Sequence, residues 1–249
     1  MSLLRLQNIS RSFGSLRALE DVSLEMPAGE LRAVIGPNGA GKTTLFNMVT
    51  GLFPPSSGTV WFADRAINAL SAERRTRLGI VRTFQITEIF PDLTVFENLR
   101  IGVETAARSN ALPWISRGRR AALERRVDEL LAVTGLAEKS ERVVSELAHG
   151  DQRVVEVAIA LSLEPKLLML DEPTAGMGDE ETDNMVSLIR RLHDEQRLSI
   201  LFIEHDMDVV FGIAQRITVL DQGRVLAEGT PQEVGADRRV RAAYLGEAA

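Results

Sequence analysis

Short apolar runs separated by turn signals fill the first part of the chain and predict β-strands. Three such runs are "LLRLQNI" (3–9), "LEDVSLEM" (19–26) and "LRAVIG" (31–36), with turns expected at Phe13-Gly14 and Pro27-Ala28-Gly29. The run "GTVWFAD" (58–64) follows the turn "PPSSG", and "IVRTFQ" (80–85) has the apolar pattern of a buried strand. The N-terminal third of the chain is therefore expected to be rich in β-structure.

From 93 to about 163 the apolar positions recur at helical spacing, as in "ALERRVDELLAVTGL". The run "LLMLDEP" (167–173) then predicts a buried strand that ends in acids, and "SILFIEHD" (199–206) predicts another. Between them "DEETDNMVSLIRRLHDEQ" (179–196) is an amphipathic helix, and "ITVLDQGRVLAEG" predicts a hairpin that turns at Asp221-Gln222-Gly223. The pattern indicates an α/β fold with an all-helical insert at about 93–163, without internal repeats.

Composition narrows the class of protein. The chain of 249 residues suits one large domain or two modest lobes, and the lack of cysteine excludes disulfides and cysteine-based metal sites. No apolar run approaches the ~18 residues of a membrane helix, and the first residues lack a signal-peptide pattern, so we expect a soluble protein. The net charge of −6 argues against broad nucleic-acid binding. The basic run "RGRRAALERR" (117–126) suggests a solvated helix face, or else a contact with lipid headgroups or a partner.

Residues 36–44, "GPNGAGKTT", fit the phosphate-binding pattern G-x-x-x-x-G-K-[ST] between a predicted strand and a predicted helix. Glycines let backbone N–H groups curl around a phosphate chain, and the following helix directs its positive end at the same phosphates. The Lys42 ammonium is expected near the β- and γ-phosphates, and the Thr43 hydroxyl on Mg²⁺. An ordinary glycine-rich turn is the alternative. The residues expected at the nucleotide are Gly36, Asn38, Gly39, Ala40, Gly41, Lys42, Thr43 and Thr44.

Two adjacent acids end the predicted strand at 167–170. Open parallel sheets place ligands at the carboxyl ends of their strands, so Asp171 is expected to hold Mg²⁺ through water. Glu172 is the candidate that polarises the attacking water. A helix cap or a turn is the alternative explanation for such a pair of acids.

Three weaker signals lie at other strand or helix ends. Gln85 follows "IVRTF" and is a candidate contact for Mg²⁺ or the attacking water. His205 follows "SILFIE", where an imidazole can bind a γ-phosphate oxygen and lose that bond on hydrolysis. Gly150 in "LAHGDQ" (147–152) lets a helix N-terminus approach a phosphate. Each of the three residues taken alone can equally have a structural role.

Taken in order, these motifs resemble those of the nucleotide-binding subunits of ABC transporters, over about 4–246. The resemblance implies a P-loop NTPase (RecA-like) core with an antiparallel β lobe, formed by 1–92 and 164–249, and a helical signature subdomain at 93–163. It also implies ATP and Mg²⁺ as ligands, with Glu172, His205, Gln85 and Lys42 in catalysis and Thr43, Gln85 and Asp171 at the metal. Phe13, 23 residues before the P-loop, resembles the aromatic residue that stacks on adenine; a core phenylalanine is the alternative.

A narrower resemblance comes from "RTFQ", "LTVFENL", "IEHDM" and the ending "YLGEA". These are similar to the ATP-binding subunit of branched-chain amino acid importers. That group implies two permease subunits, a second ABC ATPase subunit with ATP at the interface, a periplasmic or extracellular solute-binding protein, and a place on the cytoplasmic face of the inner membrane. Branched-chain amino acids are the expected cargo; other amino acids, urea, amides and carboxylates stay open.

The signature motif departs from the common L-S-G-G-Q. Ala148 replaces the serine that would contact the partner's γ-phosphate, His149 replaces the first glycine, and Asp151 replaces the glutamine, while Gly150 remains. The segment "AGMGD" (175–179) also stands where S-A-L-D-P is common. The resemblance therefore implies a weakened contact with the partner's ATP, with Ala148 and Gly150 still at the nucleotide.

The segment "ITEIFPDLTVFEN" (86–98) follows Gln85 and would form the groove that receives a permease helix. Its apolar members Ile86, Ile89, Phe90 and Leu93 can also be core residues. Two other classes remain as alternatives. A soluble ABC-type ATPase acting on DNA or ribosomes is disfavoured by the single P-loop, the short insert and the negative charge. A small-molecule kinase would leave "LAHGDQ" and His205 unexplained.

Overall fold

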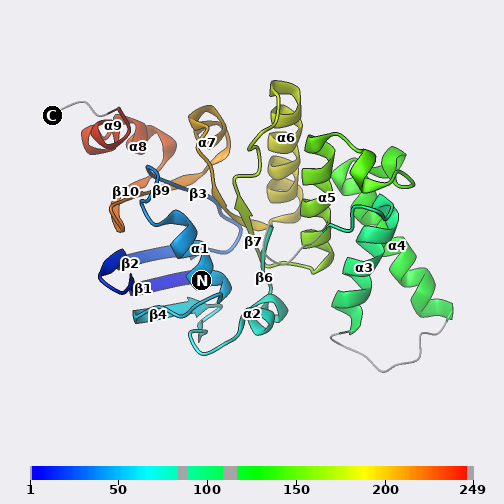
Figure 1. Ribbon diagram of the computed structural model, residues 1–249, viewed down its shortest axis with the longest axis horizontal. Coiled ribbons are helices and arrows are strands. Elements are labelled where there is room, and N and C mark those ends of the chain that lie inside the picture. The colour runs from blue at the N-terminus through cyan, green and yellow to red at the C-terminus, as the bar shows by residue number, and fades with distance from the viewer. Residues whose placement is uncertain (1, 84–88, 109–116, 246–249) are drawn as a thin grey trace.

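The computed structural model describes residues 2–83, 89–108 and 117–245, and its elements surround two β-sheets (Figure 1). One sheet is antiparallel, and its strand order is β2-β1-β4-β5. The strands are β1 (Ser2–Phe13), β2 (Leu16–Pro27), β4 (Ser57–Phe62) and β5 (Arg65–Ala66). The predicted run 58–64 was too long, because Ala63 and Asp64 adopt positive φ angles and form the turn into β5.

The second sheet has the order β10-β9-β3-β8-β7-β6, and all its neighbouring pairs are parallel except β9 with β10. Its strands are β3 (Leu31–Ile35), β6 (Ile80–Arg82), β7 (Leu167–Asp171), β8 (Ser199–Ile203), β9 (Arg216–Asp221) and β10 (Arg224–Gly229). The residues of β3, β6 and β8 are buried along their whole length, as expected for strands covered on both faces. The carboxyl ends of the parallel strands share one edge of this sheet.

Helix α1 (Lys42–Thr50) lies between the two sheets (Figure 1). Its buried Leu45, Phe46 and Met48 belong to one apolar cluster with side chains of both sheets, including Leu6 and Leu201. A second, larger cluster lies on the other face of the parallel sheet and includes residues of α3, α4, α5 and α6. The helix that follows the P-loop is therefore held on two sides by β-structure.

Helix α2 (Ala72–Leu78) has no counterpart among the sequence predictions. It begins after Ser71, whose hydroxyl accepts from the backbone of Arg74 at 3.4 Å, and ends at Gly79. Arg75 on this helix is fully buried and donates to the carbonyls of Met48 at 2.6 Å and Val49 at 3.0 Å. Burial lowers the pKa of Arg75 to about 10. Its charge lies at the negative end of α1 and stabilises that helix end.

In the described residues of the range 93–163, the predicted helical pattern is confirmed by three helices that lie beyond the β6 edge of the sheet (Figure 1). They are α3 (Val95–Arg108), α4 (Arg117–Thr134) and α5 (His149–Ser162), with two short 3₁₀ turns at Ala137–Lys139 and Val144–Glu146. In the basic run, Arg120 pairs with Glu124 at 3.1 Å on the exposed side of α4, which agrees with a solvated face.

Helix α6 (Asp179–Gln196) has the predicted bounds, and β9 and β10 form the predicted hairpin, with positive φ at Gln222 and Gly223. Strand β7 ends at Asp171, which therefore lies at the carboxyl end of the strand as expected, and Glu172 after it adopts the left-handed conformation at φ 49°. Three further helices follow: α7 (Met207–Ile213), α8 (Pro231–Ala236) and α9 (Arg238–Leu245). Within the described ranges, no helix has the length and apolar character required to cross a membrane.

Candidate functional site

The P-loop leaves the carboxyl end of β3 and returns into α1 over a tightly packed base. A Cβ at Gly36 would lie 2.1 Å from the carbonyl oxygen of Leu220, and a Cβ at Gly41 would lie 2.7 Å from that of Ala18. Only glycine fits these two positions without moving backbone. The tip of the β9–β10 hairpin adds support, since the N–H of Gly223 donates to the Ala40 carbonyl at 3.1 Å. The loop shape is thus fixed by both sheets.

The N-terminus of α1 is open to an anion. Its cap residue is Gly41 at φ 103°, which supplies no side-chain acceptor, and the first turn carries no acid. The first backbone N–H groups of a helix need an external acceptor, and the helix end carries partial positive charge. Asn38, Gly39 and Thr43 beside it are exposed. This arrangement of donors fits the phosphates of a nucleotide.

Lys42 is buried and folded back over the loop. Its Nζ donates to the carbonyls of Gly36 at 2.6 Å and Pro37 at 3.1 Å. Burial lowers the pKa of the Lys42 ammonium, and the negative charges of Glu172 and Asp171 act in the opposite direction. Asp171 at the end of β7 and Glu172 directly after it thus favour the charged form of the P-loop lysine.

Asp171, at the carboxyl end of β7, is not free of partners. Arg82 at the end of β6 donates through Nη2 to its Oδ2 and through Nη1 to Oδ1 of Asn47 on α1, the latter at 2.5 Å. The Arg82 side chain is 2% exposed, and its Cζ lies 5.4 Å from the centroid of the Phe46 ring. One buried cation therefore joins the carboxylate expected at the metal to the helix that follows the P-loop.

Glu172 and His205 face each other across the edge of the sheet. The Nε2 atom of His205 lies 3.1 Å from Oε1 of Glu172, and both side chains are exposed. Strands β7 and β8 are parallel neighbours, with Asp171 opposite Ile203, so residues just after the two strands meet. A carboxylate and an imidazole at this distance can exchange a proton with a bound water or with each other.

Gln85 and Phe13 are the remaining residues of the predicted site, and the structure describes only Phe13. Gln85 lies outside the described residues. Phe13 is 44% exposed, which excludes a core phenylalanine; its ring meets that of Phe53 edge-on at 5.4 Å between centroids. The guanidinium of Arg11 lies 4.7 Å from both ring centroids. Phe13 is thus held by neighbours on one side and presents exposed aromatic surface.

The segment "LAHGDQ" forms the start of α5, with Ala148 as the cap residue that contributes no side-chain hydrogen bond. The backbone N–H of Gly150 donates to Oε1 of Glu181 on α6 at 3.1 Å. A Cβ at Gly150 would lie 2.8 Å from that carboxylate. Asp151 pairs with Lys139 at 2.6 Å. The helix end that is expected to receive a partner's phosphate is therefore contacted by a carboxylate of its own chain.

The sequence is similar to known proteins whose class agrees with the geometry of this site. A family model described as ABC transporter matches residues 19–175. The high-affinity branched-chain amino acid transport ATP-binding protein LivG of Escherichia coli (strain K12) is 42% identical over 252 residues, which cover 99% of this chain and 98% of LivG. The protein of the same description named BraF, from Pseudomonas aeruginosa, is 38% identical with the same coverage. This chain belongs to the ABC transporter family.

Solved structures of ABC cassettes superpose along nearly the whole chain. A nucleotide-free ATP-binding cassette from an ABC transporter has a TM-score of 0.85 at 30% identity, covering 99% of this chain and 100% of that one. The ADP conformation of an ABC transporter cassette has a TM-score of 0.84 at 30% identity and the same coverage. The expected ABC fold, an α/β core with an antiparallel β lobe and added helices, is confirmed. A model described as branched-chain amino acid ATP-binding cassette transporter also matches residues 224–249.

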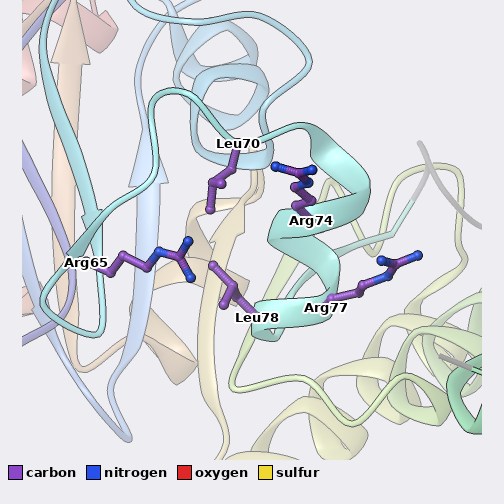
Figure 2. Close-up of a pocket in the computed structure, with 5 residues that line it drawn as sticks. All are labelled: Arg65, Leu70, Arg74, Arg77 and Leu78. Carbon is purple, nitrogen blue, oxygen red and sulfur yellow. The ribbon is translucent and has the colours of Figure 1, made fainter. Parts of the chain in front are cut away.

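The ABC cassette also has a surface pocket away from the P-loop. Figure 2 shows this pocket of about 280 Å³, lined by Arg65, Leu70, Arg74, Arg77 and Leu78. The side chain of Arg77 points away from the two leucines and is paired with Glu73 at 2.6 Å (Figure 2). The three guanidinium groups do not converge on one point, so the pocket lacks the geometry of a built anion site.

The predicted permease groove of the ABC cassette is described only in part. Ile86 lies outside the described residues, Ile89 packs against the larger core cluster, and Phe90 is exposed. The buried Asn98 of α3 holds the backbone of Phe90, accepting from its N–H at 2.9 Å and donating to its carbonyl at 3.0 Å. Phe90 is therefore an exposed aromatic side chain on a fixed backbone.

Sequence reasoning missed four residues that contact the site. Arg82 donates to both Asp171 and Asn47, Glu181 contacts Gly150, and Glu204 contacts the backbone of His205. Each is a polar residue in an apolar or amphipathic run. The arginine in "IVRTFQ" and the glutamate in "LFIEHD" are charged residues within predicted buried strands, and a buried charge requires a partner. That signal marks both residues, although it does not identify their partners.

Proposed function

We propose that this ABC subunit is the ATPase that powers import of amino acids, with branched-chain amino acids as the cargo, through a membrane permease. The observation that carries the proposal is the 42% identity with LivG across 98% of that protein. The match of residues 224–249 to the branched-chain cassette model supports the cargo class. The sulfate/thiosulfate import protein CysA of Burkholderia mallei is 38% identical over 92% of this chain, while this chain covers only 62% of CysA.

Each site residue has a role in ATP binding under this proposal. The P-loop N–H groups bind the phosphates, Lys42 leaves the carbonyls of Gly36 and Pro37 and binds the β- and γ-phosphates, and Phe13 stacks on the adenine. Thr43, Asp171 and Gln85 would hold Mg²⁺. When bound, Mg²⁺ supplies positive charge that stabilises the leaving phosphate.

Hydrolysis depends on Glu172 and His205. Glu172 orients a water molecule for attack on the γ-phosphate and accepts its proton, and its exposed carboxylate is accessible to that water. His205, 3.1 Å from Glu172, binds the γ-phosphate and keeps the carboxylate in place. The Lys42 ammonium stabilises the negative charge of the transferred group.

The second half of each site comes from a partner cassette. We infer that the chain is one ABC domain over 4–246, in which the helices within 93–163 present Ala148 and Gly150 to the partner's γ-phosphate. An ATP-binding cassette that is 25% identical to this chain has a dimeric structure in a post-hydrolysis state with ADP and Pi. Two permease subunits, a second ABC ATPase chain and a solute-binding protein complete the proposed importer, with this chain on the cytoplasmic face of the inner membrane. Phe90 lies in the groove for the permease helix.

Complementation of a deletion strain tests the proposal. We expect the wild-type chain to restore uptake of labelled leucine, isoleucine and valine, and to co-purify with permease chains from solubilised membranes. The Glu172→Gln variant should co-purify equally well without restoring uptake. Restored uptake of urea, an amide, a carboxylate or sulfate in place of the branched-chain amino acids would overturn the cargo. Absence of permease chains would overturn the transport function.

A further inference from the structure

Glu204 is a buried carboxylate directly before His205. It follows the last residue of β8 and is 4% exposed. Its Oε1 accepts from the backbone N–H of Thr174 at 2.9 Å and from the Thr174 hydroxyl at 2.5 Å. Its Oε2 accepts from the backbone N–H of His205 at 2.9 Å. Three donors from two loops therefore converge on one side chain.

These contacts close a ring around the site. Thr174 comes two residues after Glu172, whose Oε1 lies 3.1 Å from Nε2 of His205. The backbone of Glu172 is itself in the left-handed conformation, and its N–H donates to the carbonyl of Ile203 at 2.9 Å. The ring thus runs from Glu172 along the chain to Thr174, across to Glu204, along the chain to His205 and back to Glu172.

The charge of Glu204 is not needed to neutralise another charge. In the described part of the chain, no arginine, lysine or histidine side chain pairs with it. A buried carboxylate is costly unless hydrogen bonds compensate it, and here neutral donors do so. A threonine or serine would satisfy fewer donors, whereas the two carboxylate oxygens reach both loops at once.

The ring also reaches the segment "AGMGD" (175–179). The carbonyl of Thr174 accepts from the N–H of Met177 at 3.1 Å, and the carbonyl of Glu172 accepts from the N–H of Ala175 at 3.2 Å. Thr174 is buried. The turn that leads from Glu172 toward α6 is therefore anchored at its base by Glu204.

We propose that Glu204 is a positioning residue, whose buried carboxylate ties the Thr174 turn to the His205 segment and thereby holds Glu172 and His205 at their mutual distance. The inference rests on the proposed ATPase function. Glu204 is buried and its carboxylate faces donors of its own chain, so we assign it no contact with the nucleotide. Its loss should therefore affect turnover and leave ATP binding unchanged.

The Glu204→Gln variant tests the paired contacts to Thr174 and His205. A glutamine offers one acceptor oxygen and one NH₂ group, so one of the two loops faces a donor in place of an acceptor. We expect kcat of the assembled transporter to fall ~10- to 100-fold, the scale for misplacing catalytic groups, with KM for ATP within about twofold of wild type. Asp208→Asn makes the same chemical change at an exposed site four residues on and should leave kcat unchanged.

Thr174 supplies a second, milder pair of variants. Thr174→Val keeps the shape of the side chain and removes the hydroxyl bond, while Thr174→Ser keeps the hydroxyl. We expect Thr174→Val to lower kcat in the same manner as Glu204→Gln and Thr174→Ser to restore it, all with unchanged ATP affinity by titration calorimetry. The two side chains form one contact. The fold-decrease in kcat of the double variant Glu204→Gln/Thr174→Val should therefore be smaller than the product of the fold-decreases of the two single variants.

The outcomes separate the inference from the proposed function. Wild-type kcat in Glu204→Gln, or equal kcat in Thr174→Val and Thr174→Ser, overturns the positioning role. A rise in KM with unchanged kcat also overturns it, since that pattern belongs to ATP binding. If Glu204→Gln does not fold, the Thr174 pair decides. Failure of the proposed function looks different: wild type itself would lack ATPase activity, or Glu172→Gln would retain it.

Discussion

The buried ion pair of Arg82 and Asp171 is expected to contribute to the free energy of unfolding. Arg82 is 2% exposed and Asp171 18% exposed, and Arg82 also donates to Asn47. Replacing Arg82 by methionine keeps much of the side-chain volume and removes the cation. It leaves a largely buried carboxylate without its partner and breaks the link from β6 to α1.

The magnitude follows from the burial. Removing one member of a buried ion pair costs about 3–5 kcal/mol. Because Asp171 retains some solvent contact, we expect Arg82→Met to lower the free energy of unfolding by about 2–4 kcal/mol. For a domain of this size that corresponds to a loss of roughly 5–15 °C in Tm. The matched control is Arg77→Met on α2, where an exposed pair with Glu73 at 2.6 Å is worth at most about 1 kcal/mol.

Urea denaturation of the nucleotide-free chain, followed by circular dichroism, measures both variants. The loss of stability should lower the urea concentration at the midpoint of unfolding and leave the m-value unchanged. The double variant Arg82→Met/Asp171→Asn removes the charge left behind, so its loss should be smaller than the sum of the single losses by about 1–3 kcal/mol. Strict additivity, or an Arg82→Met chain as stable as wild type, would refute the reasoning that Arg82 neutralises Asp171.

Four further variants test the binding and hydrolysis of the nucleotide. Lys42→Ala should weaken ATP binding by roughly 10- to 100-fold, because it removes a charge-assisted contact of ~1.5–3 kcal/mol; near-normal affinity in titration calorimetry would count against the P-loop role. Glu172→Gln should keep ATP affinity and slow hydrolysis by ~10²-fold or more, and unchanged phosphate release in the assembled transporter would remove the base role. In the slowly hydrolysing Glu172→Gln variant, the added Ala148→Ser substitution should raise the association constant of the two cassettes about tenfold at limiting ATP. The reason is that one donor to a charged group adds ~1.5 kcal/mol. Gly150→Asp should block pairing, because it adds a second carboxylate beside that of Glu181 at the helix end that would receive the partner's phosphates; if neither change moves the dimer population, the composite site is wrong.

The sequence alone determined the elements whose signal is local. The P-loop could be predicted from the sequence because its glycines, lysine and threonines lie within nine consecutive positions. Helix α6, the hairpin of β9 and β10 and the helical run after 93 were predicted for the same reason, since periodicity and turn residues act over a few positions. The ends of the strands were less accurate, because a left-handed turn such as that at Ala63 and Asp64 depends on packing and not on residue type alone.

Only the tertiary structure decided which residues meet. Arg82 and Asp171 are 89 positions apart, and Thr174 and Glu204 are 30 apart. Their contacts exist because β6, β7 and β8 are parallel neighbours in one sheet, which places their carboxyl ends side by side. A charged residue within an apolar run of the sequence indicates that a partner is needed. Which residue becomes the partner depends on strand order and register, and these are properties of the assembled sheet.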